Sequence, residues 1–246
     1  MKEKKLYVVG IGPGNWENMT QRAQKALLEC DVIAGYTLYC ELVRPYAGDR
    51  EYITTPMMEE EKRVKLAFEA ADSGKKVCLI CSGDAGVYGL SSLACTLKNS
   101  YPEVELLVVP GVTAAVSGAS LLGAPLTTDF CLISLSDHLT GWEEIEKRLR
   151  LAAEGDFVIV LYNPESKMRK GYLKRACGIL LDIIDGDRIC GIADNIGRDG
   201  EGVRVMTLQE LSDAEADMFS TVFVGNSSTR TIDGMMVTPR GYESER

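Results

Sequence analysis

The sequence has no long hydrophobic run and fewer basic than acidic residues. No stretch of its 246 residues approaches the roughly 18 consecutive apolar residues that span a bilayer. The first residues also lack the apolar core of a signal peptide. Lys and Arg number 27 against 36 Asp and Glu, which gives a formal net charge of −9. Because nucleic-acid affinity comes mostly from basic surface, we expect no nucleic-acid partner. Because the sequence shows neither a membrane-spanning run nor a signal peptide, we expect no membrane partner and a cytoplasmic protein.

Residues typical of nucleophilic or metal-dependent catalysis are also scarce. His138 is the single histidine, and no serine or cysteine stands in a G-x-S-x-G elbow. Cysteines such as Cys95 lie in apolar stretches, as small buried hydrophobic residues do. The C-x-x-C pair Cys78 and Cys81 lies in a strand-like run, where positions three apart face opposite sides. The cysteine pattern therefore predicts no metal site and a reducing compartment. The scarcity of catalytic side chains favours a reaction in which the protein mainly positions two reactants.

Strand-like and helix-like segments alternate along the chain, which predicts an α/β protein with mainly parallel sheets. The expected strands are residues 6–9, 31–34, 77–81, 104–109, 131–135, 157–162, 189–193 and 221–224. Most of them are followed by a segment with helical spacing of apolar residues. The pattern restarts beyond Pro125, so we predict two α/β domains, residues 1–116 and 117–246.

Glycine-rich loops follow two strands of the first half. One reads G-I-G-P-G at residues 10–14, and the other reads S-G-D-A-G at residues 82–86. Both place small, flexible backbone where a parallel strand ends, which is where open α/β sheets bind ligands. A third segment, P-G-V-T-A at residues 110–114, places backbone N–H groups at the start of a helix. These groups either bind a polar ligand or are satisfied by Thr113 as the capping residue. The loops favour a cofactor held largely by main chain.

The first loop matches a dinucleotide-binding fingerprint only in part. Five residues separate Gly14 from the expected helix, and Asp31 precedes the second strand instead of following it. An NAD-type oxidoreductase is therefore the weaker interpretation. In the second loop, Asp84 either accepts hydrogen bonds from a ligand hydroxyl or ammonium group, or stabilises its own turn or the next helix. The sequence leaves both roles open.

Taken together, the three loops resemble those of the tetrapyrrole methyltransferases, which bind S-adenosylmethionine in a cleft between two α/β domains. A second set of segments resembles the precorrin-3B C(17)-methyltransferase branch: L-G-A-P-L at 122–126, D-F-C-L-I-S-L-S-D at 129–137, L-Y-N-P-x-S-K-x-R at 161–169, F-S-T-V-F-V-G-N-S at 219–227 and T-P-R-G-Y at 238–242. The resemblance implies methylation of carbon 17 of a precorrin-3-type tetrapyrrole, with ring contraction to a precorrin-4-type product in cobalamin biosynthesis, by a homodimer. The chain departs from the branch at Thr127 and Thr128, where a Gly-His pair is common, and at His138 and Gly141, where Leu and Pro are common.

The resemblance also assigns roles to residues. The implied cofactor site consists of Gly12, Pro13, Ser82, Gly83, Asp84, Val87, Thr113, Ala114, Tyr162, Asn163 and Asn195. The candidates for moving protons during contraction are Asp84, Ser134, Ser136, Asp137 and His138. Since the substrate class carries many carboxylates and the chain is net acidic, we expect a local basic cleft built from Lys167, Arg169, Arg198, Arg230 and Arg240. A corrin methyltransferase acting at another ring carbon and a non-catalytic ligand-binding module stay open as alternatives.

Overall fold

The computed structural model describes residues 3–166 and 169–242, and the chain divides into two compact units, residues 1–114 and 115–246. The predicted boundary after residue 116 lies close to this division. The strands of the N-terminal unit are β1 (Lys5–Gly10), β2 (Val32–Tyr36), β3 (Glu51–Thr55), β4 (Lys76–Cys81) and β5 (Glu105–Val109). Its helices are α1 (Gln21–Glu29), α2 (Thr37–Ala47), α3 (Glu60–Asp72) and α4 (Ser91–Leu97), followed by the 3-10 turn η1 (Lys98–Ser100).

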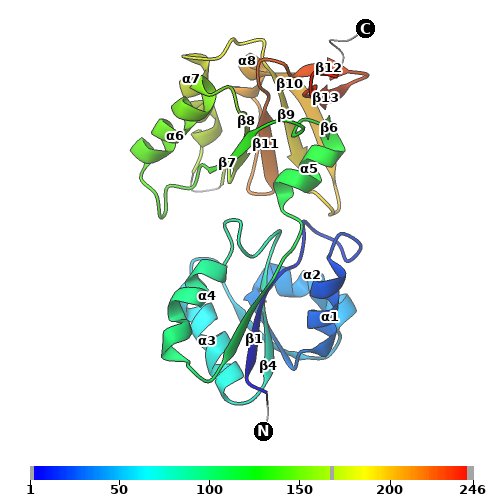
Figure 1. Ribbon diagram of the computed structural model, residues 1–246, viewed down its shortest axis with the longest axis vertical. Helices are drawn as coiled ribbons and strands as arrows, with labels where there is room; N and C mark the ends of the chain where they lie inside the picture. The colour runs from blue at the N-terminus through cyan, green and yellow to red at the C-terminus, as the bar shows by residue number, and fades with distance from the viewer. Residues whose placement is uncertain (1–2, 167–168, 243–246) are drawn as a thin grey trace. The chain divides into compact units, whose positions relative to one another are not determined.

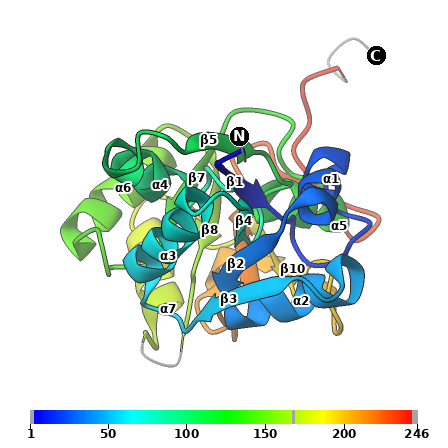
Figure 2. The ribbon, with the colours of Figure 1, turned by 90° about the horizontal axis from the view of Figure 1, so that it is seen from below.

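The N-terminal sheet is parallel throughout, with the strand order β3-β2-β4-β1-β5. Helices α3 and α4 cover one face, where Phe68 is fully buried, and α1 and α2 cover the other, where Leu27 is fully buried. Both views of the ribbon show this separation (Figures 1 and 2). Because both faces are covered, β1 and β4 are nearly continuous apolar runs, as buried parallel strands usually are.

The C-terminal unit contains a second five-stranded sheet and a smaller three-stranded one. Its strands are β6 (Gly123–Ala124), β7 (Phe130–Ser134), β8 (Val158–Tyr162), β9 (Ile189–Asp194), β10 (Gly202–Thr207), β11 (Ser220–Val224), β12 (Arg230–Ile232) and β13 (Met235–Val237). Its helices are α5 (Ala114–Leu122), α6 (Trp142–Glu154), α7 (Tyr172–Leu181) and α8 (Leu208–Leu211). Helices α6, α7 and α8 share one core with the larger sheet, and Gly118 of α5 packs near Phe223 on the other face.

The α/β class is confirmed, but the second sheet differs from the expected parallel arrangement. Its order is β10-β9-β11-β8-β7, and only β7 and β8 pair in parallel. The reason lies in the connections. A short loop joins β9 to β10, and antiparallel strands can be joined in this way, whereas parallel neighbours need a long crossover such as the one through α6 between β7 and β8.

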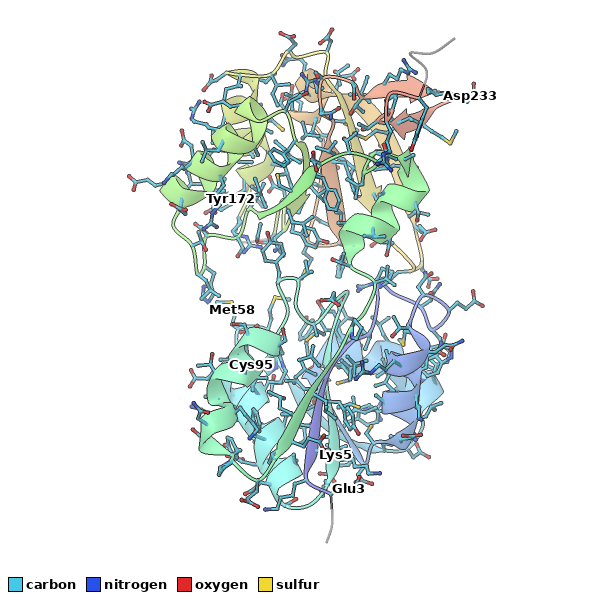
Figure 3. The ribbon with its side chains drawn as sticks, viewed as in Figure 1. Glu3, Lys5, Met58, Cys95, Tyr172 and Asp233 are labelled. Carbon is cyan, nitrogen blue, oxygen red and sulfur yellow. The ribbon has the colours of Figure 1, made fainter. Side chains whose placement is uncertain are left out.

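All eight cysteines are free thiols; six are buried, Cys131 is half-buried, and one is exposed against the sequence prediction. Cys95 on α4 is exposed, because it lies on the helix face turned away from the core (Figure 3). Over residues 3–166 and 169–242, no group of three His, Cys, Asp or Glu side chains is placed to hold a metal ion. Among the same residues, no helix has both the length and the apolar character needed to cross a bilayer.

Candidate functional site

The predicted glycine loops lie side by side at the carboxyl edge of the N-terminal sheet. Strand β1 is the neighbour of both β4 and β5, with Gly10 opposite Cys81 and Val9 opposite Val109. Because the three strands are parallel, the loops that follow them leave the sheet at one edge. The structure therefore brings the three loops together, and their use as one cofactor site stays a prediction.

Reciprocal backbone hydrogen bonds join the first two loops. The Gly12 N–H donates to the Gly83 carbonyl at 3.0 Å, and the Gly83 N–H donates to the Gly12 carbonyl at 2.7 Å. Both glycines have a positive φ, +74° and +65°, a conformation that side chains with a Cβ adopt at a cost. The junction is thus made by main chain alone.

Gly10 and Gly111 allow the third loop to approach the other two. A Cβ on Gly111 would lie 2.1 Å from the Gly83 carbonyl oxygen, and a Cβ on Gly10 would lie 2.7 Å from the Gly111 nitrogen. Backbone atoms cannot move aside as a flexible side chain can, so these positions admit only glycine. Sequence reasoning did not place either residue in the site, although both stand inside the quoted loop motifs.

Asp84 holds the second and third loops together. Its carboxylate accepts hydrogen bonds from the Gly86 N–H at 2.8 Å and from the Gly111 N–H at 2.9 Å. Of the two roles left open by the sequence, the structure shows stabilisation of its own turn, with an added bond to the third loop. The Thr20 hydroxyl, which caps α1, donates to the Pro110 carbonyl at 3.1 Å and anchors the same loop.

The other cofactor candidates of this unit surround the loop junction. Pro13 is buried, whereas Ser82, Val87, Thr113 and Ala114 are half-buried. The edge thus presents small side chains and main chain around a fixed backbone, which is what a main-chain cofactor site requires.

Asp31, the acid considered for a dinucleotide ribose, lies at the opposite edge of the sheet. Its carboxylate accepts from the Lys76 N–H at 2.8 Å, and Lys76 is the first residue of β4. The carboxyl end of β2 carries Tyr36 instead of an acid. The end of β2 therefore lacks the acid that a dinucleotide site uses, as the sequence indicated.

A second polar edge occurs in the C-terminal unit. Ser134 of β7 is the register partner of Tyr162 of β8, so the loops after these strands start together. The antiparallel strand β11 begins at the same edge, and its first residue, Ser220, pairs with Asp194 at the end of β9. Asn163 and Asn195 follow β8 and β9 and have φ values of +53° and +50°. Non-glycine residues in this conformation are uncommon and concentrate at functional sites.

Hydrogen bonds connect three of the predicted residues on these loops with Asn163. The Ser134 hydroxyl accepts from the Asn163 amide at 3.0 Å and from the Ser136 N–H at 3.2 Å. The Ser136 hydroxyl accepts from Arg169 Nη1 at 2.6 Å. Tyr162, at the end of β8, accepts at its hydroxyl from the Ala115 N–H at 2.8 Å and so ties the start of α5 to this edge.

The remaining proton-transfer candidates lie on exposed surface. Asp137 is exposed and accepts from the Tyr172 hydroxyl at 2.6 Å, and this hydrogen bond raises the pKa of Tyr172 above its usual value of 10.0. Tyr172, labelled in Figure 3, is the first residue of α7, and its ring packs edge-on against Trp142. His138 is also exposed. The structure therefore groups Ser134 and Ser136 with Asn163, and it places His138 outside that group.

The predicted cations lie on different segments of the C-terminal unit. Arg198 lies over the Phe219 ring, 5.1 Å from its centroid, whereas Arg230 and Arg240 are exposed. Arg230 belongs to β12, which pairs with β13, and β13 pairs with β6. Strand β6 follows the C-terminal end of α5, whereas Tyr162 contacts the N-terminal end of that helix. The nine residues of α5 span about 14 Å between these two ends. The expectation of one basic cleft therefore stays a prediction. Lys167 lies outside the described residues.

Comparisons with known proteins identify the family of the chain. The model of the Tetrapyrrole (Corrin/Porphyrin) Methylases matches residues 5–212. The "Probable cobalt-factor III C(17)-methyltransferase" of Salmonella typhimurium is 45% identical over 238 residues, which cover 96% of this chain and 99% of that protein. The "Cobalt-factor III methyltransferase" of Priestia megaterium is 46% identical, and the match covers 97% of this chain but 45% of that protein.

Solved structures give the same result. The methyltransferase CobJ superposes with a TM-score of 0.88 at 36% identity, over 95% of this chain and 99% of that chain. A uroporphyrin-III C-methyltransferase from Thermus thermophilus, complexed with S-adenosylhomocysteine, has a TM-score of 0.74 at 20% identity and so shares the fold. By its loops, its fold and these matches, the chain belongs to the tetrapyrrole (corrin/porphyrin) methylase family.

Proposed function

We propose that the chain is an S-adenosylmethionine-dependent C-methyltransferase of cobalamin biosynthesis. It methylates carbon 17 of a precorrin-3-type tetrapyrrole, with contraction of the ring to a precorrin-4-type product. The names of the near full-length relatives support this activity, including the Precorrin-3B C(17)-methyltransferase of Sinorhizobium sp, which is 39% identical over 96% of both chains. The proposal includes the homodimer and the cytoplasmic location expected from the sequence.

The observation that carries the proposal is the loop junction of the N-terminal unit. Gly12 and Gly83 exchange backbone hydrogen bonds, Gly111 approaches Gly83 where a Cβ would not fit, and Asp84 fixes the third loop. Such a cradle suits a cofactor with many polar groups and little need for charged side chains. When bound, S-adenosylmethionine supplies an activated methyl group, so the protein needs no nucleophile of its own.

The chain's own residues would then bind, orient and exclude water. The N-terminal loops would hold the cofactor through backbone N–H and C=O groups, and Pro13 and Val87 would provide apolar contact. Within the C-terminal unit, the Ser134 hydroxyl already accepts two hydrogen bonds, so its own proton is available as a donor. Ser134 is therefore the predicted proton-transfer candidate that its surroundings orient best.

An anaerobic incubation tests the activity. The protein is given S-adenosylmethionine with either a cobalt-loaded or a metal-free precorrin-3-type substrate, and the products are followed by mass spectrometry and absorbance. We expect the gain of one methyl group together with the spectral change of ring contraction. Cofactor binding without methyl gain on either substrate would contradict the proposal and favour another ring position or acceptor. Light scattering after size exclusion tests the homodimer.

A further inference from the structure

Arg169 is a half-buried cation whose polar atoms are only partly satisfied. Its Nη1 donates to the Ser136 hydroxyl at 2.6 Å, whereas its Nε is buried and has no hydrogen-bond partner within the described part of the chain. Among the described residues, 3–166 and 169–242, no ion pair involves its guanidinium. A buried donor without a partner costs free energy, so folded proteins rarely keep one without a use for it.

The backbone of Arg169 is fixed, so the guanidinium starts from a defined position. The Arg169 N–H donates to the carbonyl and to the hydroxyl of Ser166, both at 3.1 Å, and the Ser166 N–H donates back at 3.4 Å. Ser136, its side-chain partner, is positioned in turn by the bond from its N–H to Ser134. The cation is thus held between the loops that follow β7 and β8.

The acidic side chains on these loops are engaged elsewhere. Glu165 accepts from the Gly171 N–H at 3.0 Å and the Leu173 N–H at 3.2 Å, which caps the start of α7. Asp137 accepts from the Tyr172 hydroxyl. Several other arginines of this unit have acidic partners, such as Arg204 with Asp194 at 3.0 Å. Unlike these arginines, Arg169 has no acidic partner among the described residues.

We propose that Arg169, oriented by Ser136, binds a carboxylate of the ligand. The guanidinium presents donors in a planar fork that matches a carboxylate, and the unpaired Nε–H supplies one of them. The inference rests on the proposed function, which brings carboxylates from two sources: the acidic side chains of the tetrapyrrole and the amino-acid end of the cofactor. Arg169 is a specificity-determining residue for whichever of the two it contacts.

Binding of non-reacting ligands tests this assignment. S-adenosylhomocysteine is titrated by calorimetry, and uroporphyrin and its methyl ester are titrated by fluorescence quenching. The proteins are the wild type, Arg169→Gln, Arg169→Lys and Ser136→Ala. The matched control is Arg148→Gln, because Arg148 is an exposed arginine on α6 that pairs with Glu144.

We expect Arg169→Gln to weaken one of the two acidic ligands about 10- to 100-fold, the range of a charge-assisted hydrogen bond. Arg169→Lys keeps the charge but loses the fork, so it weakens the same ligand by a smaller factor, and it decides the matter if Arg169→Gln does not fold. A loss for uroporphyrin but not for its ester identifies the tetrapyrrole carboxylate, and a loss for S-adenosylhomocysteine identifies the cofactor. Unchanged affinity for both ligands overturns the inference. Because these titrations involve no turnover, absence of methyl transfer by the wild type would contradict the proposed function alone.

Discussion

Replacing Gly111 by alanine would force apart the loops of the N-terminal unit. The new Cβ would lie 2.1 Å from the Gly83 carbonyl oxygen and 2.6 Å from the Gly10 carbonyl carbon, and neither backbone atom can move without moving its strand end. The overpacking alone costs about 1–3 kcal/mol. Displacement of the Gly111 N–H from the Asp84 carboxylate costs a further amount of about 1.5–3 kcal/mol. We therefore expect the unit to lose about 2.5–6 kcal/mol of its free energy of unfolding.

The assay is urea unfolding followed by the fluorescence of Trp16, with Trp142 replaced by Phe so that the signal reports the N-terminal unit. Calorimetry with S-adenosylhomocysteine measures the cradle itself, and we expect affinity to fall at least about tenfold if the loss of one charge-assisted bond reaches the ligand. Gly178→Ala is the control for the substitution. Gly178 lies in α7 with no atom within 4 Å of the added Cβ, so alanine should stabilise that helix by about 0.5–1 kcal/mol. Wild-type stability and affinity in Gly111→Ala would refute the argument from backbone contact.

The other predictions concern single side chains. Asp84→Asn should weaken S-adenosylhomocysteine binding about 10-fold or more in calorimetry. The reason is that the two oxygens of the carboxylate accept from Gly86 and Gly111, whereas an amide has only one oxygen to accept with. Equal affinity would show that the third loop does not need this bond. Cys95 should account for the one rapidly reacting thiol with Ellman's reagent, because it is the exposed cysteine. Burial raises the pKa of Cys81 and of Cys131 to about 11, which slows their reaction. A fast phase that survives in Cys95→Ser would contradict this prediction. The hydrogen bond from Tyr172 to Asp137 raises the pKa of the phenol, so its stabilising effect is present below pH 10 and is lost as the pH rises through the raised value. Absorbance titration should show one tyrosine shifting to lower pKa in Asp137→Asn, and an unchanged titration curve would exclude the bond in solution.

The sequence predicted those parts of the fold that carry a strong local pattern. β1 and β4 are apolar runs bounded by glycine loops, and the structure places both within one residue of the predicted limits. Strand β10 was missed because it is an edge strand whose first residues are exposed, so it shows no apolar run. Helix α2 was missed because it contains Pro45, which usually signals a helix end.

The sequence predicted the parts of the candidate site that are formed by main chain. It did not predict which side chains form hydrogen bonds with each other across the fold. Three glycine-rich motifs suffice to place loops at one edge of a parallel sheet. No local pattern states that the carboxylate of Asp84 points at Gly111, 27 positions away, or that Arg169 meets Ser136. The small sheet that carries Arg230 was not predicted for the same reason, because it pairs with β6 across a long stretch of chain.

The strand order of the second sheet has a consequence for how the protein is made. β11 stands at the centre of that sheet between β9 and β8, yet it is synthesised after all four of its companions. During synthesis, β8 and β9 lack the strand that pairs between them until residue 224 has left the ribosome. The first sheet, in contrast, has all of its strands once residue 109 has left it. Nascent chains arrested between these points would therefore carry a folded first unit and an open second one, whose unpaired strand edges are the kind of surface that chaperones protect.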